Sequence, residues 1–140
     1  MEKLNAGENI YCCFGSLKKL HKFKDNLIQK KILKENEILY YHSMSDGNKT
    51  KLTLTNINEE WSKYRLVCTT PTITVGCSFD TIHFHSTFII AYPSCFIRDL
   101  MQTHMRVRNL INNIIYYKLP FTHHYNFIKS QAHISLNLYH

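Results

Sequence analysis

The segment of residues 102–108 carries the side chains in this sequence that are best suited to contact a phosphate: Gln102, Arg106 and Arg108. On a helix, Gln102 and Arg106 would share a face because they are four residues apart. A guanidinium presents a rigid fork of N–H donors, which suits the charge that develops in phosphoryl transfer better than an ammonium does. Taken alone, the segment also fits a second interpretation, in which these are solvated charges on an exposed helix face.

A second segment, residues 69–80, is rich in hydroxyl groups around a single glycine, Gly76. Hydroxyls and a close backbone approach suit a sugar-phosphate strand that is held without its sequence being read. We therefore expect Thr70, Thr72 and Thr74 to contact nucleic acid. A threonine-rich edge strand explains the same composition equally well.

Ser16 and His42 each follow a short apolar run. The Ser16 hydroxyl, together with backbone N–H groups at the start of a following helix, could bind a phosphate. The alternative is that Gly15 and Ser16 form only a turn and a helix cap. His42 opens a polar turn cluster and is predicted to contact nucleic acid as well.

The elements that would position these residues alternate between strand and helix. Five apolar runs predict strands at residues 10–14, 37–41, 64–69, 87–92 and 114–119, and segments with helical spacing or cap residues predict helices at 17–34, 56–61 and 94–110. Such alternation is typical of an α/β fold with right-handed crossovers. Apolar residues on both faces of 87–92 indicate a mainly parallel sheet.

In an open parallel sheet, ligands gather at the carboxyl ends of the strands. The loops that start at Gly15, His42, Thr70 and Pro93 should therefore share one edge of the sheet. Three of the segments with unusual chemistry begin in these loops.

Composition fits one compact domain with an anionic partner. The chain has 140 residues, of which 44% are apolar and 13% aromatic, enough to form a core and to exclude intrinsic disorder. Its net charge is +7, and no acidic residue follows Asp99. A nucleic acid is the partner that this charge favours.

Cysteine usage and hydropathy indicate an intracellular protein without a metal site. The five cysteines lack Cys-x-x-Cys spacing, so we expect small buried side chains in a reducing compartment. The nine histidines have no acidic or cysteine neighbours at ligand spacing, and no metal is predicted. No stretch reaches the roughly 18 apolar residues that span a bilayer, and no signal peptide is recognisable.

Several blocks, in their order and spacing, resemble the C-terminal helicase domain of superfamily-two helicases of the origin-binding-protein type found in large DNA viruses. The resemblance covers about residues 10–117 and rests on Asn58-Glu59-Glu60-Trp61, Thr70-Pro71-Thr72-Ile73, Val75-Gly76, Ser78-Phe79, Arg98-Asp99 and Gln102 with Arg106-Val107-Arg108. Its strongest blocks, residues 69–80 and 98–110, look like helicase motifs V and VI.

The resemblance implies a RecA-like, P-loop-NTPase-like three-layer domain over residues 1–119, followed by a C-terminal extension or the start of a further region at 120–140. It implies half of an ATP-dependent DNA helicase, in the host cytoplasm or nucleus if the protein is viral. Arg106 would be the arginine finger, Gln102 would sense the nucleotide, and Gly76 and Asp80 would bind it.

The sequence departs from the general pattern at Met105, where such helicases have glycine, and at Arg108, which follows Arg106 by two positions instead of three. Either arginine could then be the finger. Cys77 and Ser78 replace the usual x-Asp after the glycine of motif V, which leaves Asp80 as the nearest acid.

The chain has no Gly-x-x-x-x-Gly-Lys-Ser/Thr loop and no Asp-Glu-x-Asp/His run to hold phosphates and Mg²⁺. ATP and Mg²⁺ would therefore bind only with an N-terminal RecA-like ATPase domain, in cis or in trans, and the isolated chain should not hydrolyse ATP. Two alternatives are a non-catalytic nucleic-acid-binding or adaptor module, and a small-molecule α/β enzyme.

Overall fold

The fold is built on one parallel sheet of five strands. A computed structural model describes residues 2–41, 55–71, 78–92 and 97–118. The strands are β1 (Ile10–Phe14), β2 (Ile38–Tyr40), β3 (Leu66–Thr69), β4 (Ser86–Ile90) and β5 (Ile114–Lys118), in the spatial order β2-β3-β1-β4-β5. Every strand pair is parallel, so the predicted α/β class and parallel sheet are confirmed.

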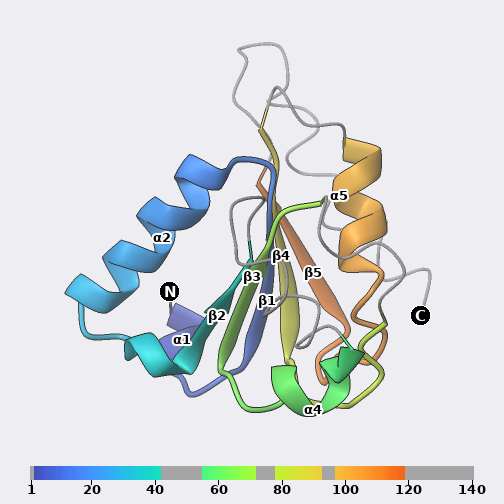
Figure 1. Cartoon of the computed structure of the whole chain (residues 1–140), viewed down its shortest axis with the longest axis horizontal. Coiled ribbons are helices and arrows are strands. Elements are labelled where there is room, and N and C mark those ends of the chain that lie inside the picture. Colours follow the sequence, from blue (N-terminus) through green and yellow to red (C-terminus); the bar gives the residue numbers. More distant parts are fainter. Residues whose placement is uncertain (1, 42–54, 72–77, 93–96, 119–140) are drawn as a thin grey trace.

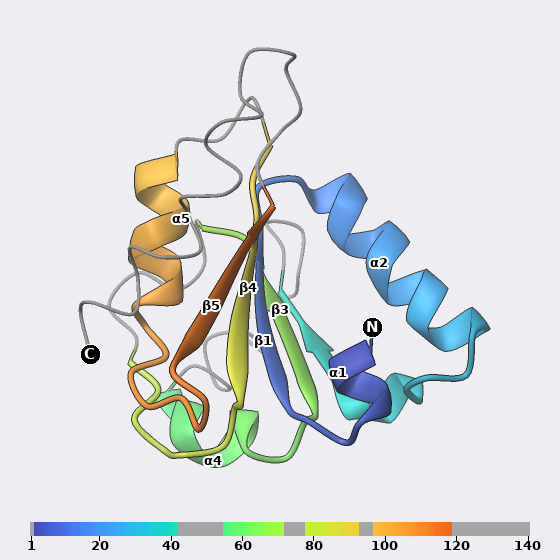
Figure 2. The ribbon, with the colours of Figure 1, turned by 180° about the vertical axis from the view of Figure 1, so that it is seen from behind.

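Helices lie on both sides of this sheet. They are α1 (Glu2–Asn5), α2 (Leu17–Gln29), the short 3-10 helix η1 (Glu35–Glu37), α4 (Ile57–Trp61) and α5 (Ile97–His104). Figure 1 shows the sheet between α2 on the left and α5 on the right, and Figure 2 shows the same layers from behind. Two separate buried clusters correspond to these two sides.

Alternation along β1 divides its side chains between the two clusters. Ile10, Cys12 and Phe14 pack on the α2 side, and Tyr11 and Cys13 on the α5 side. All five are buried, because β1 is the central strand and both its faces are covered. This two-sided burial explains why the strand is a continuous apolar run in the sequence.

The α5 side contains an aromatic cluster around Trp61, the single tryptophan of the chain. Trp61 is fully buried, stacks on Tyr11 and Phe79 at centroid distances of 5.5 and 5.7 Å, and donates a hydrogen bond from Nε1 to the Tyr41 hydroxyl at 3.1 Å. The short helix α4 is thereby fixed against the sheet.

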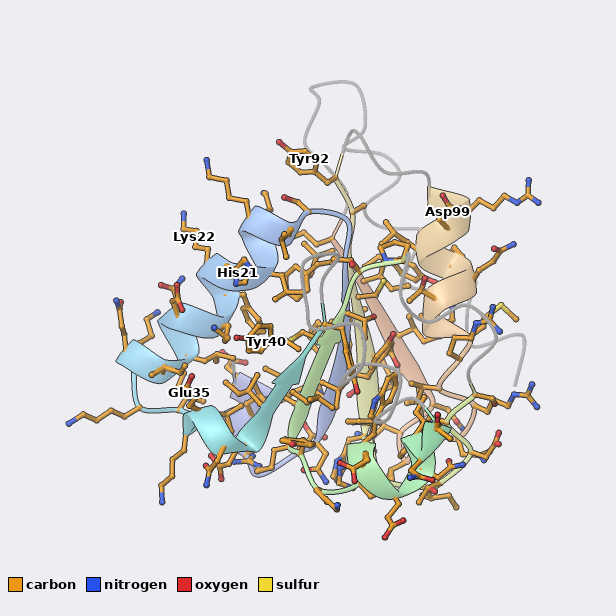
Figure 3. All side chains as sticks on the ribbon, viewed as in Figure 1. His21, Lys22, Glu35, Tyr40, Tyr92 and Asp99 are labelled. Atoms are coloured by element: carbon orange, nitrogen blue, oxygen red, sulfur yellow. The ribbon has the colours of Figure 1, made fainter. Side chains whose placement is uncertain are left out.

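The α2 side is more aliphatic. Leu20 and Leu27 of α2 are fully buried over the sheet. Near the outer strand, His21 of α2 lies beside Tyr40 of β2, with ring centroids 5.9 Å apart (Figure 3). Fewer large aromatic rings are buried on this side, where Phe14 is the buried aromatic residue of the described core.

Helix α2 ends at Gln29, so the prediction that it reaches residue 34 is wrong. Lys31 adopts a positive φ of 57°, and Ile32 N–H donates to the Leu27 carbonyl while Lys31 N–H donates to that of Ile28. These paired bonds form a Schellman motif, which terminates a helix. The motif usually has glycine at the left-handed position, and the sequence offers lysine.

Helix α5 ends at His104, which corrects the predicted end near Leu110. Residues Phe79 and Val107 instead form a parallel bridge, in which Phe79 N–H donates to the Arg106 carbonyl at 2.7 Å and Arg108 N–H to the Phe79 carbonyl at 3.1 Å. These long-range bonds replace the helical ones. The predicted start at Pro93 and Ser94 lies outside the described residues.

The helix predicted at residues 56–61 is α4, which begins one residue after Asn56. Asn56 occupies the N-cap position of α4, but its side chain makes no capping hydrogen bond.

Candidate functional site

The end of α5 and the turn after it border a hollow of about 630 Å³. Its polar lining comes from Ser78, Gln102, His104, Arg106 and Arg108, and its apolar walls from Met105, Val107, Leu110 and Ile115. Two segments that are distant in the sequence meet here through the bridge between Phe79 and Val107. The hollow therefore joins the last described part of the hydroxyl-rich segment to the arginine segment.

Arg106 lies in the turn after α5, so the prediction that Gln102 and Arg106 share a helix face is wrong in detail. The two residues still line the same hollow. The Arg106 backbone is held at both ends, by Phe79 N–H at its carbonyl and by the Thr103 carbonyl at its own N–H. Within the described residues its half-buried side chain has no carboxylate partner, which leaves the guanidinium able to bind an anion.

Arg108 is placed differently. Its Nε lies 3.7 Å from Asp80 Oδ1, and both side chains are more than half exposed. Ser78 donates a hydrogen bond from its hydroxyl to the same carboxylate oxygen at 3.0 Å. An exposed ion pair contributes little to stability, but it orients Arg108 toward the protein's own acid. The sequence did not distinguish the two arginines, and within the described part of the chain Arg108 has a carboxylate neighbour and Arg106 has none.

The segment that carries Asp80 is anchored by Asn58 of α4. Asn58 Oδ1 accepts hydrogen bonds from Asp80 N–H at 2.7 Å, from Thr81 N–H at 3.2 Å and from the Thr81 hydroxyl at 3.2 Å. Asn109 adds a bond from its amide to the Asp80 carbonyl at 2.6 Å. In the sequence, Asn58 belongs to a motif block, but its anchoring of Asp80 and Thr81 was not predicted. The available signal was the residue type, because asparagine side chains commonly form hydrogen bonds with turn backbones.

Two other predicted contacts, Ser16 and Thr70, lie at the carboxyl edge of the sheet. Ser16 is the N-cap of α2 and accepts a hydrogen bond from Lys19 N–H at 3.5 Å, and Gly15 N–H donates to the Ile90 carbonyl. These contacts agree with the interpretation of Gly15 and Ser16 as a turn and a helix cap. Phosphate binding by Ser16 stays a prediction. Thr70 directly follows β3 at the same edge and is partly buried.

Ser16 and the hollow are not brought together, since α2 and α5 lie on opposite sides of the sheet (Figures 1 and 2). His42, Thr72, Thr74 and Gly76 lie outside the described residues, so their predicted contacts stay predictions.

Three cysteines are buried as predicted: Cys12, Cys13 and Cys68. Burial, reinforced by the neighbouring Cys12 thiol, raises the pKa of the Cys68 thiol well above its usual range. The His83 ring forms a hydrogen bond with the Tyr64 carbonyl at 2.7 Å, and the His85 ring accepts a hydrogen bond from Asn9 N–H at 2.9 Å. Over the described ranges, no group of three or more His, Cys, Asp or Glu side chains could hold a metal ion.

No helix among the described residues is long and apolar enough to cross a bilayer.

Comparison with known proteins gives consistent matches. A family model described as "Origin of replication binding protein" matches residues 1–123. The replication origin-binding protein of Psittacid herpesvirus 1 is 40% identical over 60 residues, which are 41% of this chain and 7% of that protein. The putative replication origin-binding protein of Acanthamoeba polyphaga mimivirus is 34% identical over 84 residues, 56% of this chain and 11% of that protein.

The replication origin-binding protein of Varicella-zoster virus (strain Dumas) is 40% identical over 63 residues, 43% of this chain and 7% of that protein. The chain thus matches only about a tenth or less of the length of these relatives.

Proposed function

This chain belongs to the family of origin of replication binding proteins, and from that premise we propose that it is the C-terminal, RecA-like half of an ATP-dependent DNA helicase or translocase. The parallel α/β sheet is compatible with such a domain. Because the match covers a small part of the relatives, the activity of the whole protein belongs to the proposal.

The observation that carries the proposal is the hollow lined by Ser78, Gln102, Arg106 and Arg108. Arg106 has a fixed backbone and no acidic partner among the described residues, and Arg108 lies beside Asp80. We assign the arginine finger to Arg106. Gln102 would contact the nucleotide from the preceding turn of α5, and Asp80 and Gly76 would lie near it.

ATP and Mg²⁺ would be held by an N-terminal RecA-like domain, since this sequence lacks the phosphate-binding loop. When that domain closes on the hollow, Arg106 would donate hydrogen bonds to the transferring phosphoryl group and stabilise its charge in the transition state. Ser16 and Thr70, with His42, Thr72 and Thr74, would hold one DNA strand at the carboxyl edge. Alternating closure and opening would move that strand.

The test is Arg106→Ala in a protein that includes the N-terminal half, with ATP hydrolysis measured on single-stranded DNA. We expect turnover to fall about 10³-fold or more, with a much smaller change in ATP affinity, because the contact forms in the transition state. Arg108→Ala should be milder. Arg98→Ala, on the exposed part of α5, is the matched control.

If Arg108→Ala abolishes hydrolysis while Arg106→Ala stays within about threefold of the parent, the arginine finger is Arg108. A threefold change in rate corresponds to less than about 1 kcal/mol at the barrier. Parental hydrolysis in both variants would refute the assignment of residues 98–110 to motif VI and of the arginine finger to this chain. The second candidate, a non-catalytic nucleic-acid-binding module, would then stand, favoured by the net charge of +7.

A further inference from the structure

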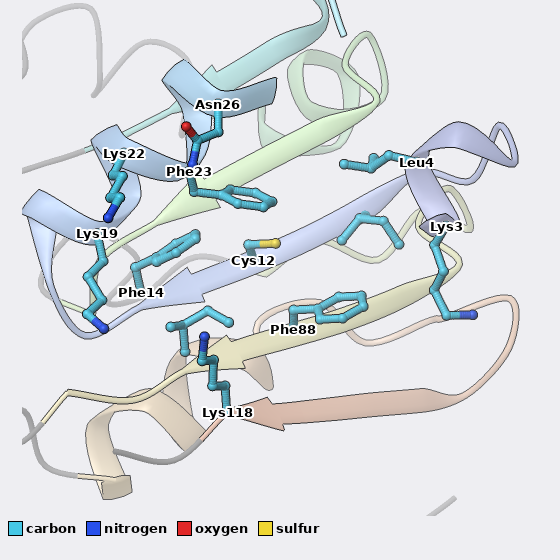
Figure 4. A pocket seen from close by; sticks show the side chains of 12 residues that line it. Lys3, Leu4, Cys12, Phe14, Lys19, Lys22, Phe23, Asn26, Phe88 and Lys118 are labelled. Carbon is cyan, nitrogen blue, oxygen red and sulfur yellow. The ribbon is translucent and has the colours of Figure 1, made fainter. Parts of the chain in front are cut away.

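We propose that the groove between α2 and strands β1 and β4 docks an acidic, amphipathic segment of a partner protein. The groove encloses about 360 Å³ (Figure 4). Its floor is formed by apolar side chains of the two strands, and its rim by lysines: Ile10, Cys12, Phe14, Phe88 and Ile90 below, and Lys3, Lys19, Lys22 and Lys118 around them. It lies on the side of the sheet opposite Gln102 and Arg106, away from the proposed arginine finger, and its rim residue Lys19 is three positions from Ser16, a proposed DNA contact.

The groove exists because the two sides of the sheet are covered unequally. On the α5 side of β4 and β5, Thr87, Ile89 and Ile115 are buried. On the α2 side, Phe88, Ile90 and Tyr116 are only partly buried, although two of them are aromatic and one is aliphatic. Within the described residues, α2 packs over β1 and leaves the outer part of this face without a helix (Figures 1 and 2).

The charges around the groove determine the kind of occupant. Among the residues that the structure describes, no acidic side chain lines it. Lys3 is the one rim lysine with an ion pair among the described residues, at 3.5 Å from Glu8, and Lys19, Lys22 and Lys118 have none there. An apolar floor ringed by cations complements a segment whose apolar residues enter the groove while its carboxylates reach the rim.

The same charges argue against two occupants closer to hand. Residues 119–140 of this chain contain a lysine and no acid, so they offer the rim nothing of opposite sign. A second copy of the chain carries a net charge of +7 and would bring more cations to a cationic rim.

A nucleic acid fits the rim but not the floor. Binding of single strands uses free aromatic faces on which bases stack. Here Phe14 packs against Phe23 at 5.5 Å, and Phe88 stacks on Tyr116 at 4.6 Å with an interplanar angle of 16°. In the described part of the lining, Asn26 is the one uncharged polar side chain, so base edges would meet almost no hydrogen-bonding groups there.

The test uses the full chain and a synthetic fluorescent peptide of roughly 16 residues, helical, with leucines at i, i+3, i+4 and i+7 and glutamates on both flanks. Peptide binding to the parent chain is measured by fluorescence anisotropy and compared with binding to the rim variant, which combines Lys22→Glu with Lys118→Glu. The matched control is Lys18→Glu combined with Lys34→Glu, which changes the net charge equally at exposed lysines outside the groove. A peptide with glutamine in place of glutamate controls for its charge.

We expect the rim variant to weaken binding of the acidic peptide at least about tenfold, and the control variant to weaken it less than about threefold. Phe88→Ala, checked for folding by its thermal melt, should also weaken binding. The glutamine peptide should bind more weakly than the acidic one.

Four results would overturn the proposal. The first is an equal loss of peptide affinity in the two lysine variants, and the second is equal binding of the two peptides. The third is displacement of the peptide by single-stranded DNA whose own binding needs the rim lysines. The fourth is a dimer, detected by sedimentation, that dissociates in the rim variant. Peptide binding that occurs only after Phe127→Ser with Ile128→Ser would assign the groove to the chain's own C-terminal residues instead.

Discussion

The two sides of the sheet differ in how they are packed and in what they position. The α5 side has a closed aromatic core in which Trp61 contacts Tyr11 and Phe79, and Phe79 is bonded through its backbone to Arg106 and Arg108. The α2 side has a smaller aliphatic core and an open groove with a lysine rim.

The difference indicates where the molecule needs rigidity. A side chain that stabilises a transition state must be held within a fraction of an ångström. On the α5 side a continuous series of contacts leads from the core through Phe79 to Arg106. Among the described residues, the α2 side contributes none of the side chains that line the arginine hollow, and its partly buried apolar side chains suit contact with another molecule.

The largest effect that separates the two sides is expected from Trp61→Ala. Removing this fully buried ring leaves a cavity between Tyr11 and Phe79. It also removes the Nε1–H that donates a hydrogen bond to the Tyr41 hydroxyl. We expect a loss of about 3–5 kcal/mol in the free energy of unfolding, measured by urea denaturation followed by circular dichroism.

Phe88→Ala is the matched change on the other side, since Phe88 is only partly buried in the groove floor. Its cost should stay below about 2 kcal/mol, because less apolar area returns to water. Equal losses in the two variants would remove the distinction between a closed and an open side.

Asn58→Ala should have a smaller and more local effect. The substitution removes the acceptor for Asp80 N–H, Thr81 N–H and the Thr81 hydroxyl. These groups are exposed, so water replaces much of what is lost and we expect about 1 kcal/mol in stability. Hydrogen exchange at the amides of Asp80 and Thr81 should become about fivefold faster.

Asn56→Ala is the control for that change, because Asn56 lies next to α4 and makes no capping bond. If Asn58→Ala leaves exchange at Asp80 and Thr81 at the parental rate, Asn58 does not anchor this segment. The link from α4 to the arginine hollow would then run through the aromatic core alone.

The sequence predicts the strands better than the helix ends, and the reason is physical. Each strand contains at least one buried apolar residue, and the apolar run leaves a local signal, most clearly in Ile10–Phe14. The end of α5 depends on the bridge between Phe79 and Val107, which are 28 positions apart, and no local pattern reports it. Lys31 shows the same limit, since its left-handed conformation occurs where the sequence has no glycine.

The candidate site was predictable in its side chains and not in its connections. Residue type and spacing pointed to Gln102, Arg106 and Arg108, and all three line one hollow. The pairing of Asp80 with Arg108 and the anchoring of Asp80 by Asn58 join residues more than 20 positions apart. Such pairings follow from the tertiary fold, so a single sequence does not reveal which arginine has an acidic neighbour.

The smallest expected difference between the two sides is their response to alkaline pH. Burial raises the pKa of the Tyr11 hydroxyl, which shares a hydrogen bond with Thr69 at 2.7 Å, well above its usual range, and burial raises the pKa of Tyr117 to about 12. Both belong to the α5 side. Their folded-state pKa values exceed the unfolded value of about 10, so their contribution is complete below pH 10 and is lost as the pH rises through the folded-state values. For Tyr11 the loss at about pH 10.5 should be under about 1 kcal/mol.

Tyr11→Phe with Tyr117→Phe should flatten the decline of unfolding free energy between about pH 9 and 11. The matched pair on the α2 side is Tyr40→Phe with Tyr116→Phe. If the α2-side pair flattens the decline as much as the α5-side pair does, alkaline sensitivity does not come from the closed core.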